Sequence, residues 1–284
     1  MKAPTPHREK GKESVGVPPT PTVDPRKGGV GVSTGNGARP KVAFFDFASC
    51  EGCQLTVVDA LQTHLDLLSA VDIVQFREAM SECSDDYQIA FIEGSCTRAR
   101  DEERLKVIRG RAQLVVTLGA CAHMGGVNAG RIGQSLEAVR GYVYGTQADG
   151  IDTGPVRPIG SVIPVDAFIP GCPIDRGEFA AAVKALLQGR MPSVPDYPLC
   201  AECKLHENVC VYQYGKTCLG PVTRAGCGAI CPTYRVGCEG CRGLVPGANM
   251  TSLRSVLAEH GLDERAADDS LRLFLSAELA GHEA

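Results

Sequence analysis

Cysteine constrains this chain more than any other residue type. The sequence holds 14 cysteines, and eight of them lie between residues 200 and 241. This segment is rich in glycine, and its apolar residues show too little periodicity to bury a core of their own. We therefore expect disulfides, zinc or iron–sulfur clusters to hold it together.

Length and composition limit the class of protein. A chain of 284 residues that is 44% hydrophobic can form one well-packed domain and a smaller second unit. Its net charge of −4 gives no general argument for nucleic-acid binding. Residues 1–39, rich in Pro, Gly, Thr and Lys, resemble no signal peptide and are expected to be a disordered extension.

The same sequence predicts a cytoplasmic protein with no membrane span. No window approaches the roughly 18 apolar residues that a membrane helix needs. A reducing cytoplasm argues against a framework of disulfides, which leaves zinc and iron–sulfur clusters as the alternatives.

From Lys41 onward, short apolar runs alternate with helical patterns. Runs of strand length lie at residues 41–47, 71–76, 89–92, 114–118 and 165–169. Helices are expected between 97 and 110 and over 175–189, and another in which Leu55, Val58, Leu61, Leu65 and Leu68 form one apolar face. The alternation predicts a parallel sheet with helices on its faces.

Four cysteines lie at the carboxyl ends of these strands. Cys50 and Cys53 follow the first strand, and Cys121 and Cys172 end later ones. Ligands of open parallel sheets bind at that edge, so four thiolates there can form one set of metal ligands. A cysteine at a strand end is alternatively a small buried apolar residue, and Cys50-Glu-Gly-Cys53 alone also fits a redox pair.

Five segments of the chain resemble the small, electron-transferring subunit of nickel–iron hydrogenases. They lie at residues 46–55, 91–95, 119–121, 169–173 and 200–242. The likeness is closest to the cytoplasmic enzymes that couple to NAD(P), coenzyme F420 or heterodisulfide reductase. A subunit of complex I is a more distant relative, because adjacent cysteines would be expected there in place of Cys50-Glu-Gly-Cys53, and the eight-cysteine segment would be missing.

The resemblance implies an α/β fold. It comprises a flavodoxin-like parallel-sheet domain at residues 40–190, a small irregular, cysteine-rich iron–sulfur domain at 191–250 and a C-terminal helical tail at 251–284. It also implies three [4Fe-4S] clusters. The proximal cluster would be bound by Cys50, Cys53, Cys121 and Cys172. The distal cluster would be bound by Cys200, Cys203, Cys210 and Cys218, and the medial cluster by Cys227, Cys231, Cys238 and Cys241.

Two positions depart from the membrane-bound and periplasmic members of the family. The resemblance implies that those members have a histidine at the position of Cys200 and a proline at the position of Cys231. Their medial cluster would then have three irons. Because both positions are thiols here, all three clusters are expected to have four irons. Cys83 and Cys96 are expected to be core or incidental thiols.

The resemblance also implies partners. A nickel–iron hydrogenase large subunit would hold the hydrogen-splitting site, so this chain would carry no catalytic residue, and a flavin- or cluster-containing subunit would accept the electrons. Glu51 and Glu93 lie where they could carry protons, and His123 and His206 are expected beside ligands or on the surface. Two alternatives remain from the residues: an electron-transfer subunit of another oxidoreductase, and a zinc-stabilised structural or regulatory protein.

Overall fold

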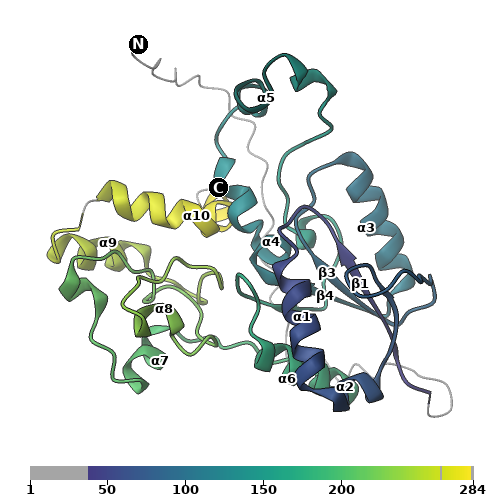
Figure 1. Cartoon of the computed structure of the whole chain (residues 1–284). Coiled ribbons are helices and arrows are strands. Elements are labelled where there is room, and N and C mark those ends of the chain that lie inside the picture. Colours follow the sequence, from purple (N-terminus) through teal and green to yellow (C-terminus); the bar gives the residue numbers. More distant parts are fainter. Residues whose placement is uncertain (1–37, 263, 283–284) are drawn as a thin grey trace.

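A computed structural model describes residues 38–262 and 264–282 of the chain (Figure 1). Nearly all of the extension expected at residues 1–39 therefore lies outside the described residues. Five strands form one parallel sheet in the order β2-β1-β3-β4-β5. The strands are β1 (Lys41–Asp46), β2 (Asp72–Phe76), β3 (Ile89–Glu93), β4 (Leu114–Leu118) and β5 (Ala167–Ile169). This is the strand order of flavodoxin, so the expected α/β fold class is confirmed.

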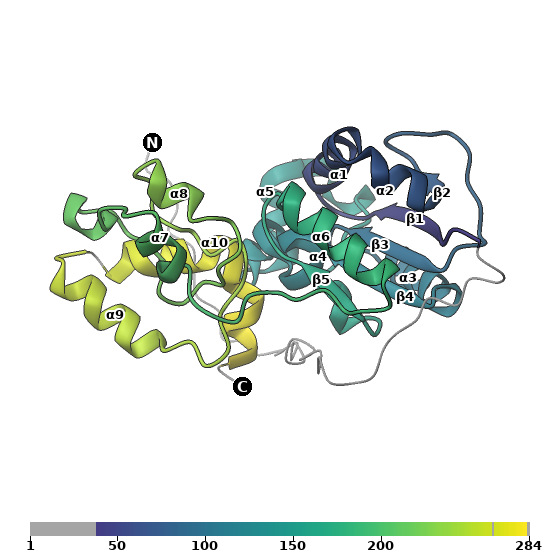
Figure 2. The same cartoon turned by 90° about the horizontal axis from the view of Figure 1, so that it is seen from below.

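Helices cover both faces of the sheet (Figure 2). On one face lie α1 (Gly52–Thr63), α2 (Leu65–Ala70) and α6 (Arg176–Leu187), and on the other lies α3 (Ala99–Arg111). Strands β3 and β4 are buried along their whole length. Their sequences are therefore continuous apolar runs, which is why composition alone located them.

The prediction of one continuous apolar face on the first helix is wrong. The helix breaks at His64, whose φ of −115° and ψ of 69° are not helical, so α1 and α2 are separate. Val57 and Ala60 face the core, whereas Leu55 is 57% exposed and Leu65 is 66% exposed. A spacing of three and four residues cannot distinguish a face that packs on the sheet from one that remains on the surface.

The region between β4 and β5 contains short helices. They are α4 (Gly119–Met124), η2 (Gly126–Arg131), α5 (Leu136–Tyr144), η3 (Gly145–Gly150) and η4 (Ile159–Ser161). Helix α5 begins at Ser135, whose hydroxyl accepts a hydrogen bond from the Ala138 amide. No residue of α5 is buried, and the helix projects from the body of the molecule (Figure 1).

The cysteine-rich segment has more of an apolar core than its own sequence indicated. Its short elements are α7 (Cys200–Leu205), η5 (Val211–Tyr214) and α8 (Ile230–Thr233). Two later helices, α9 (Met250–Glu259) and α10 (Glu264–His282), pack Leu253, Leu257, Leu271 and Leu275 against Leu219 and Val222. The C-terminal helices thus supply the core that the glycine-rich segment lacks.

Helix α10 also contacts the sheet-containing part of the chain, where it lies against η2 and α4 (Figure 1). Ala277 packs with Ala129 and Val156 in a small apolar cluster. The C-terminal helix therefore connects the two parts. Within the described part of the chain, no helix is long and apolar enough to cross a membrane.

This packing predicts different effects for two leucines of α10. Leu275 is fully buried, so Leu275→Ala should lower the free energy of unfolding by about 2–5 kcal/mol. Leu273 is 37% exposed, and Leu273→Ala should have a much smaller effect. Thermal unfolding of the two variants under anaerobic conditions measures the difference. Equal losses would show that α10 does not complete the core.

Candidate metal centres

The four cysteines of the sheet domain come together at the carboxyl edge of the sheet. We call Cys50, Cys53, Cys121 and Cys172 the proximal set. Cys50 lies in the loop after β1, and Cys53 lies in the first turn of α1. The pKa of the Cys121 thiol is raised to about 12, first by burial and then by the charges of Cys172 and Cys50. Burial and then Cys50 raise the pKa of Cys172 in the same way. The thiols therefore lie close enough to interact electrostatically.

Backbone geometry brings these loops together. Gly119 has a φ of +79°, and a Cβ atom there would lie 2.4 Å from the Cys53 sulfur. Only glycine leaves room for that approach. Burial raises the pKa of the Cys53 thiol, and the charges of Glu93, Cys172 and Cys121 add to this shift, so the loop that carries Cys172 lies near Cys53.

Glu93 holds the start of α1. Its carboxylate is 2% exposed and accepts hydrogen bonds from the backbone amides of Cys53, at 3.2 Å, and Gln54, at 2.8 Å. A negative charge at a helix N-terminus is stabilising, although burial raises the pKa of this carboxyl. The sequence suggested only a proton carrier here and missed this structural role. An acidic residue in an otherwise apolar buried strand was the available signal.

A second set of thiols surrounds α7 and η5. We call Cys200, Cys203, Cys210 and Cys218 the distal set. A Cβ atom on Gly220 would lie 3.3 Å from the Cys200 sulfur and 3.4 Å from the Cys218 sulfur. The pKa of Cys200 is raised to about 11, first by burial and then by the charges of Cys218, Cys203 and Cys210.

The remaining four cysteines form the medial set: Cys227, Cys231, Cys238 and Cys241. The pKa of Cys241 is raised to about 12, first by burial and then by the charges of Cys227, Cys172 and Cys231. Cys238 is buried, and the charges of Cys218 and then Cys241 contribute to its raised pKa. Cys238 therefore lies near the distal set as well, and the division of these eight cysteines into two sets stays a prediction.

Neighbouring sets meet at two places. Cys172 of the proximal set lies near Cys241 of the medial set, and after burial its charge is among those that raise the pKa of Cys241. The Cys238 amide of the medial set donates to the sulfur of Cys218 in the distal set, at 3.2 Å. These contacts are those expected for sets in the order proximal, medial, distal, although the distal cysteines precede the medial ones in the sequence.

The donor chemistry fits iron–sulfur clusters. Four thiols per group match the usual ligands of a four-iron cluster, and also those of a zinc ion. Among the described residues, no three His, Cys, Asp or Glu side chains lie as ligands of one metal ion would. A cluster binds each thiolate to a different iron, so its ligands lie farther apart than those of one ion.

The two remaining cysteines belong to no set, whereas His123 follows Cys121 by two residues and a Cβ atom on Gly228, next to Cys227, would lie 3.8 Å from His206 Nε2. Cys96 is fully buried, 3.4 Å from a guanidinium nitrogen of Arg157, and Cys83 is exposed. The His123 ring stacks on Phe168 with centroids 3.8 Å apart, and burial lowers its pKa to about 3, with Arg224 adding to the effect. His206 is exposed at the end of α7.

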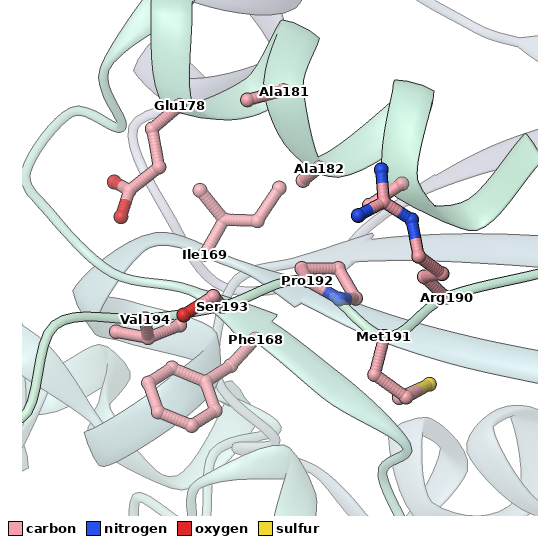
Figure 3. Close-up of a pocket in the computed structure, with 11 residues that line it drawn as sticks. Phe168, Ile169, Glu178, Ala181, Ala182, Arg190, Met191, Pro192, Ser193 and Val194 are labelled. Carbon is pink, nitrogen blue, oxygen red and sulfur yellow. The ribbon is translucent and has the colours of Figure 1, made fainter. Parts of the chain in front are cut away.

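One cavity lies away from the cysteines. Its volume is about 220 Å³, and it lies between β5, α6 and the chain segment from Arg190 to Val194 (Figure 3). Phe168, Ile169 and alanines of α6 make its lining largely apolar. It contains no cysteine, and nothing in its lining indicates a redox role.

Comparison with known proteins agrees with these sites. The family model described as "NADH ubiquinone oxidoreductase, 20 Kd subunit" matches residues 50–186. That range contains the whole proximal set and ends before the eight-cysteine segment. The model therefore covers only the part that this chain shares with the complex I subunit.

Full-length relatives are hydrogenase subunits. Subunit delta of sulfhydrogenase 2 from Pyrococcus furiosus is 38% identical over 236 residues, which is 82% of this chain and 98% of that protein. A subunit of the F420-non-reducing hydrogenase vhu from Methanococcus voltae is 31% identical over 82% of this chain and 93% of that protein. Subunit delta of the NAD-reducing hydrogenase HoxS from Cupriavidus necator is 27% identical over 55% of this chain and 82% of its own length.

A solved structure shares the fold. A chain of an NAD⁺-reducing [NiFe]-hydrogenase in the H2-reduced state aligns with a TM-score of 0.50 and 27% identity, over 56% of this chain and 96% of its own. The parallel sheet and the relatives that align over most of this chain lead to one conclusion. The chain belongs to the family of iron–sulfur, electron-transferring small subunits of nickel–iron hydrogenases.

Proposed function

We propose that this chain carries three [4Fe-4S] clusters on its proximal, medial and distal sets and conducts electrons between a hydrogenase large subunit and a downstream redox subunit. The observation that supports this most is that Cys172 lies near Cys241 while the Cys238 amide donates to the Cys218 sulfur, which favours a medial set between the other two. When bound, the clusters would supply one-electron carriers in that order. The chain's own residues set their spacing, burial and hydrogen bonding.

Hydrogen bonds to sulfur would adjust the potential at each set. The Cys238 amide already donates to the Cys218 sulfur at 3.2 Å. Donors of this kind stabilise the more negative, reduced state of a bound cluster and raise its reduction potential. The protein thus contributes tuning and position, and the hydrogen chemistry belongs to the partner that holds nickel and iron.

The surface beside the proximal set supports docking of the large subunit. Cys50 and Cys172 are exposed. Three exposed apolar side chains, Leu55, Val127 and Ile132, lie close to the proximal set in the sequence, and we call them the proximal patch. The backbone of Val127 lies near the thiol of Cys121. An apolar partner that covers this patch would keep oxidants away from a cluster.

A second exposed apolar surface lies in the cysteine-rich part and supports the exit of electrons there. We call it the exit patch, and it comprises Leu205, Val209, Tyr214, Ile230, Tyr234 and Val236. These residues flank Cys210 of the distal set and Cys231 of the medial set, both of which are exposed. We assign this patch to the flavin- or cluster-containing acceptor subunit.

A reducing compartment, such as the cytoplasm, fits the state of the cysteines. All 14 are free thiols in the structure, and twelve are taken up by the three sets. Oxidation to disulfides would remove ligands from the clusters. The large subunit, the acceptor subunit and the cytoplasmic location therefore form one consistent proposal.

The all-cysteine medial set gives a spectroscopic prediction. EPR spectra of the air-oxidised wild-type protein should not be dominated by a [3Fe-4S] signal, because Cys231 supplies a fourth thiolate. Cys231→Ser should produce that signal and lower the iron content. Cys83→Ser is the matched control, since Cys83 is also exposed but lies in no set, and it should leave spectrum and iron unchanged. A dominant [3Fe-4S] signal in the wild type would refute the four-iron medial cluster.

The two patches predict separable losses of binding. Leu55→Asp places a charge in the proximal patch and should reduce co-purification of the large subunit at least about tenfold, since burying an unpaired charge is costly. Tyr234→Asp should weaken only the acceptor subunit. Val107→Asp, at an exposed position of α3, serves as the control and should affect the binding of neither partner. Quantitative mass spectrometry of anaerobic pull-downs measures both partners, and loss of both with either variant would argue against two docking surfaces.

A further inference from the structure

One buried arginine connects loops that belong to two cysteine sets. Arg242 directly follows Cys241 of the medial set, and its side chain is 1% exposed. Its Nη1 and Nη2 atoms each donate to a different carboxylate oxygen of Glu178, both at 2.8 Å. Glu178 lies in the first turn of α6, in the sheet domain. The pair therefore joins the cysteine-rich part to the sheet domain through a bidentate contact.

The same guanidinium contacts two backbone carbonyls. Nη1 donates to the Pro170 oxygen at 3.1 Å, and Nε donates to the Ala225 oxygen at 2.8 Å. Pro170 precedes the proximal ligand Cys172 by two residues, and Ala225 precedes the medial ligand Cys227 by two. The Arg242 guanidinium thus contacts the loop of Cys172 and the loop of Cys227, and Arg242 itself is the residue after Cys241.

The backbone at Gly226 lies so close to this guanidinium that no side chain would fit there. A Cβ atom on Gly226 would lie 2.2 Å from Nη2 of Arg242, and Gly226 has a φ of +114°. Glu178 lies at one end of the cavity beside α6, and Arg190 lies at the other end (Figure 3). Glu178 therefore pairs with Arg242, and not with the Arg190 side chain across the cavity.

The chemistry of arginine is specific to this position. Its fork has five N–H donors in fixed directions, and four of them are used by Glu178, Pro170 and Ala225. Lysine would keep the charge but could not reach both carbonyls and both carboxylate oxygens in this geometry.

We propose that Arg242 is a positioning residue which, with Glu178, fixes the distance between the proximal and medial cysteine sets. This inference rests on the proposed ligand assignment. The rate of electron exchange between two centres falls steeply with their separation, so a rigid connection between the Cys172 loop and the Cys227 and Cys241 loops keeps that rate high and uniform.

The test uses the full chain, purified anaerobically with its partners, as wild type, Arg242→Lys and Glu178→Gln. Arg254→Lys is the matched control, because Arg254 pairs with Asp268 at 2.7 Å on the surface between α9 and α10. Hydrogen–deuterium exchange is followed in residues 168–174 and 224–229. EPR spectra of the fully reduced protein report the spin–spin interaction between neighbouring clusters, and iron analysis of the wild type tests the proposed function separately.

In Arg242→Lys and Glu178→Gln, both segments should exchange about tenfold faster or more, and the spin–spin interaction should weaken while the control stays like the wild type. If a variant loses iron, faster exchange in both segments still supports the inference. Unchanged exchange, faster exchange in residues 224–229 alone, or an unchanged spin–spin interaction in iron-loaded variants would each overturn it. A wild type without iron would instead refute the ligand assignment.

Discussion

The arrangement of the whole chain depends on the contact between the loops of Cys172 and Cys241. There, Cys172 of the sheet domain lies close enough to Cys241 of the cysteine-rich part to affect the pKa of that thiol. The Arg242–Glu178 pair lies beside this contact, and α10 crosses from one part to the other. Thiols gathered in groups of four repel one another when ionised, so the ligand loops must be held by other interactions until metal neutralises that charge.

Much of the fold could be predicted from the sequence because its signals are local. Continuous apolar runs located β3 and β4, and the cysteine positions at strand ends indicated that four thiols would meet at one edge of the sheet. Contacts between distant segments gave no such signal. The exposed Leu55, the capping by Glu93 and the packing of Leu275 beneath Gly240 depend on which surfaces meet in three dimensions. The order of the medial and distal sets likewise could not follow from spacing alone.

Family membership clarifies what the thiols are for. The segment shared with the complex I subunit ends before the eight-cysteine segment, so the added cysteines distinguish this chain from that relative. Relatives such as the sulfhydrogenase delta subunit align over nearly their whole length. The zinc-stabilised alternative lacks such support. The proximal patch follows proximal cysteines in the sequence, and the exit patch flanks distal and medial ones, which is consistent with two different docking partners.

Metal analysis of the anaerobically purified chain, together with the proteins that co-purify with it, tests the central claim most directly. Iron, nickel and zinc are counted per copy of this chain. Three four-iron clusters docked to a hydrogenase large subunit predict about 12 iron atoms and near-stoichiometric nickel. About three zinc ions without iron would contradict the account, because the thiol sets would then be structural zinc sites.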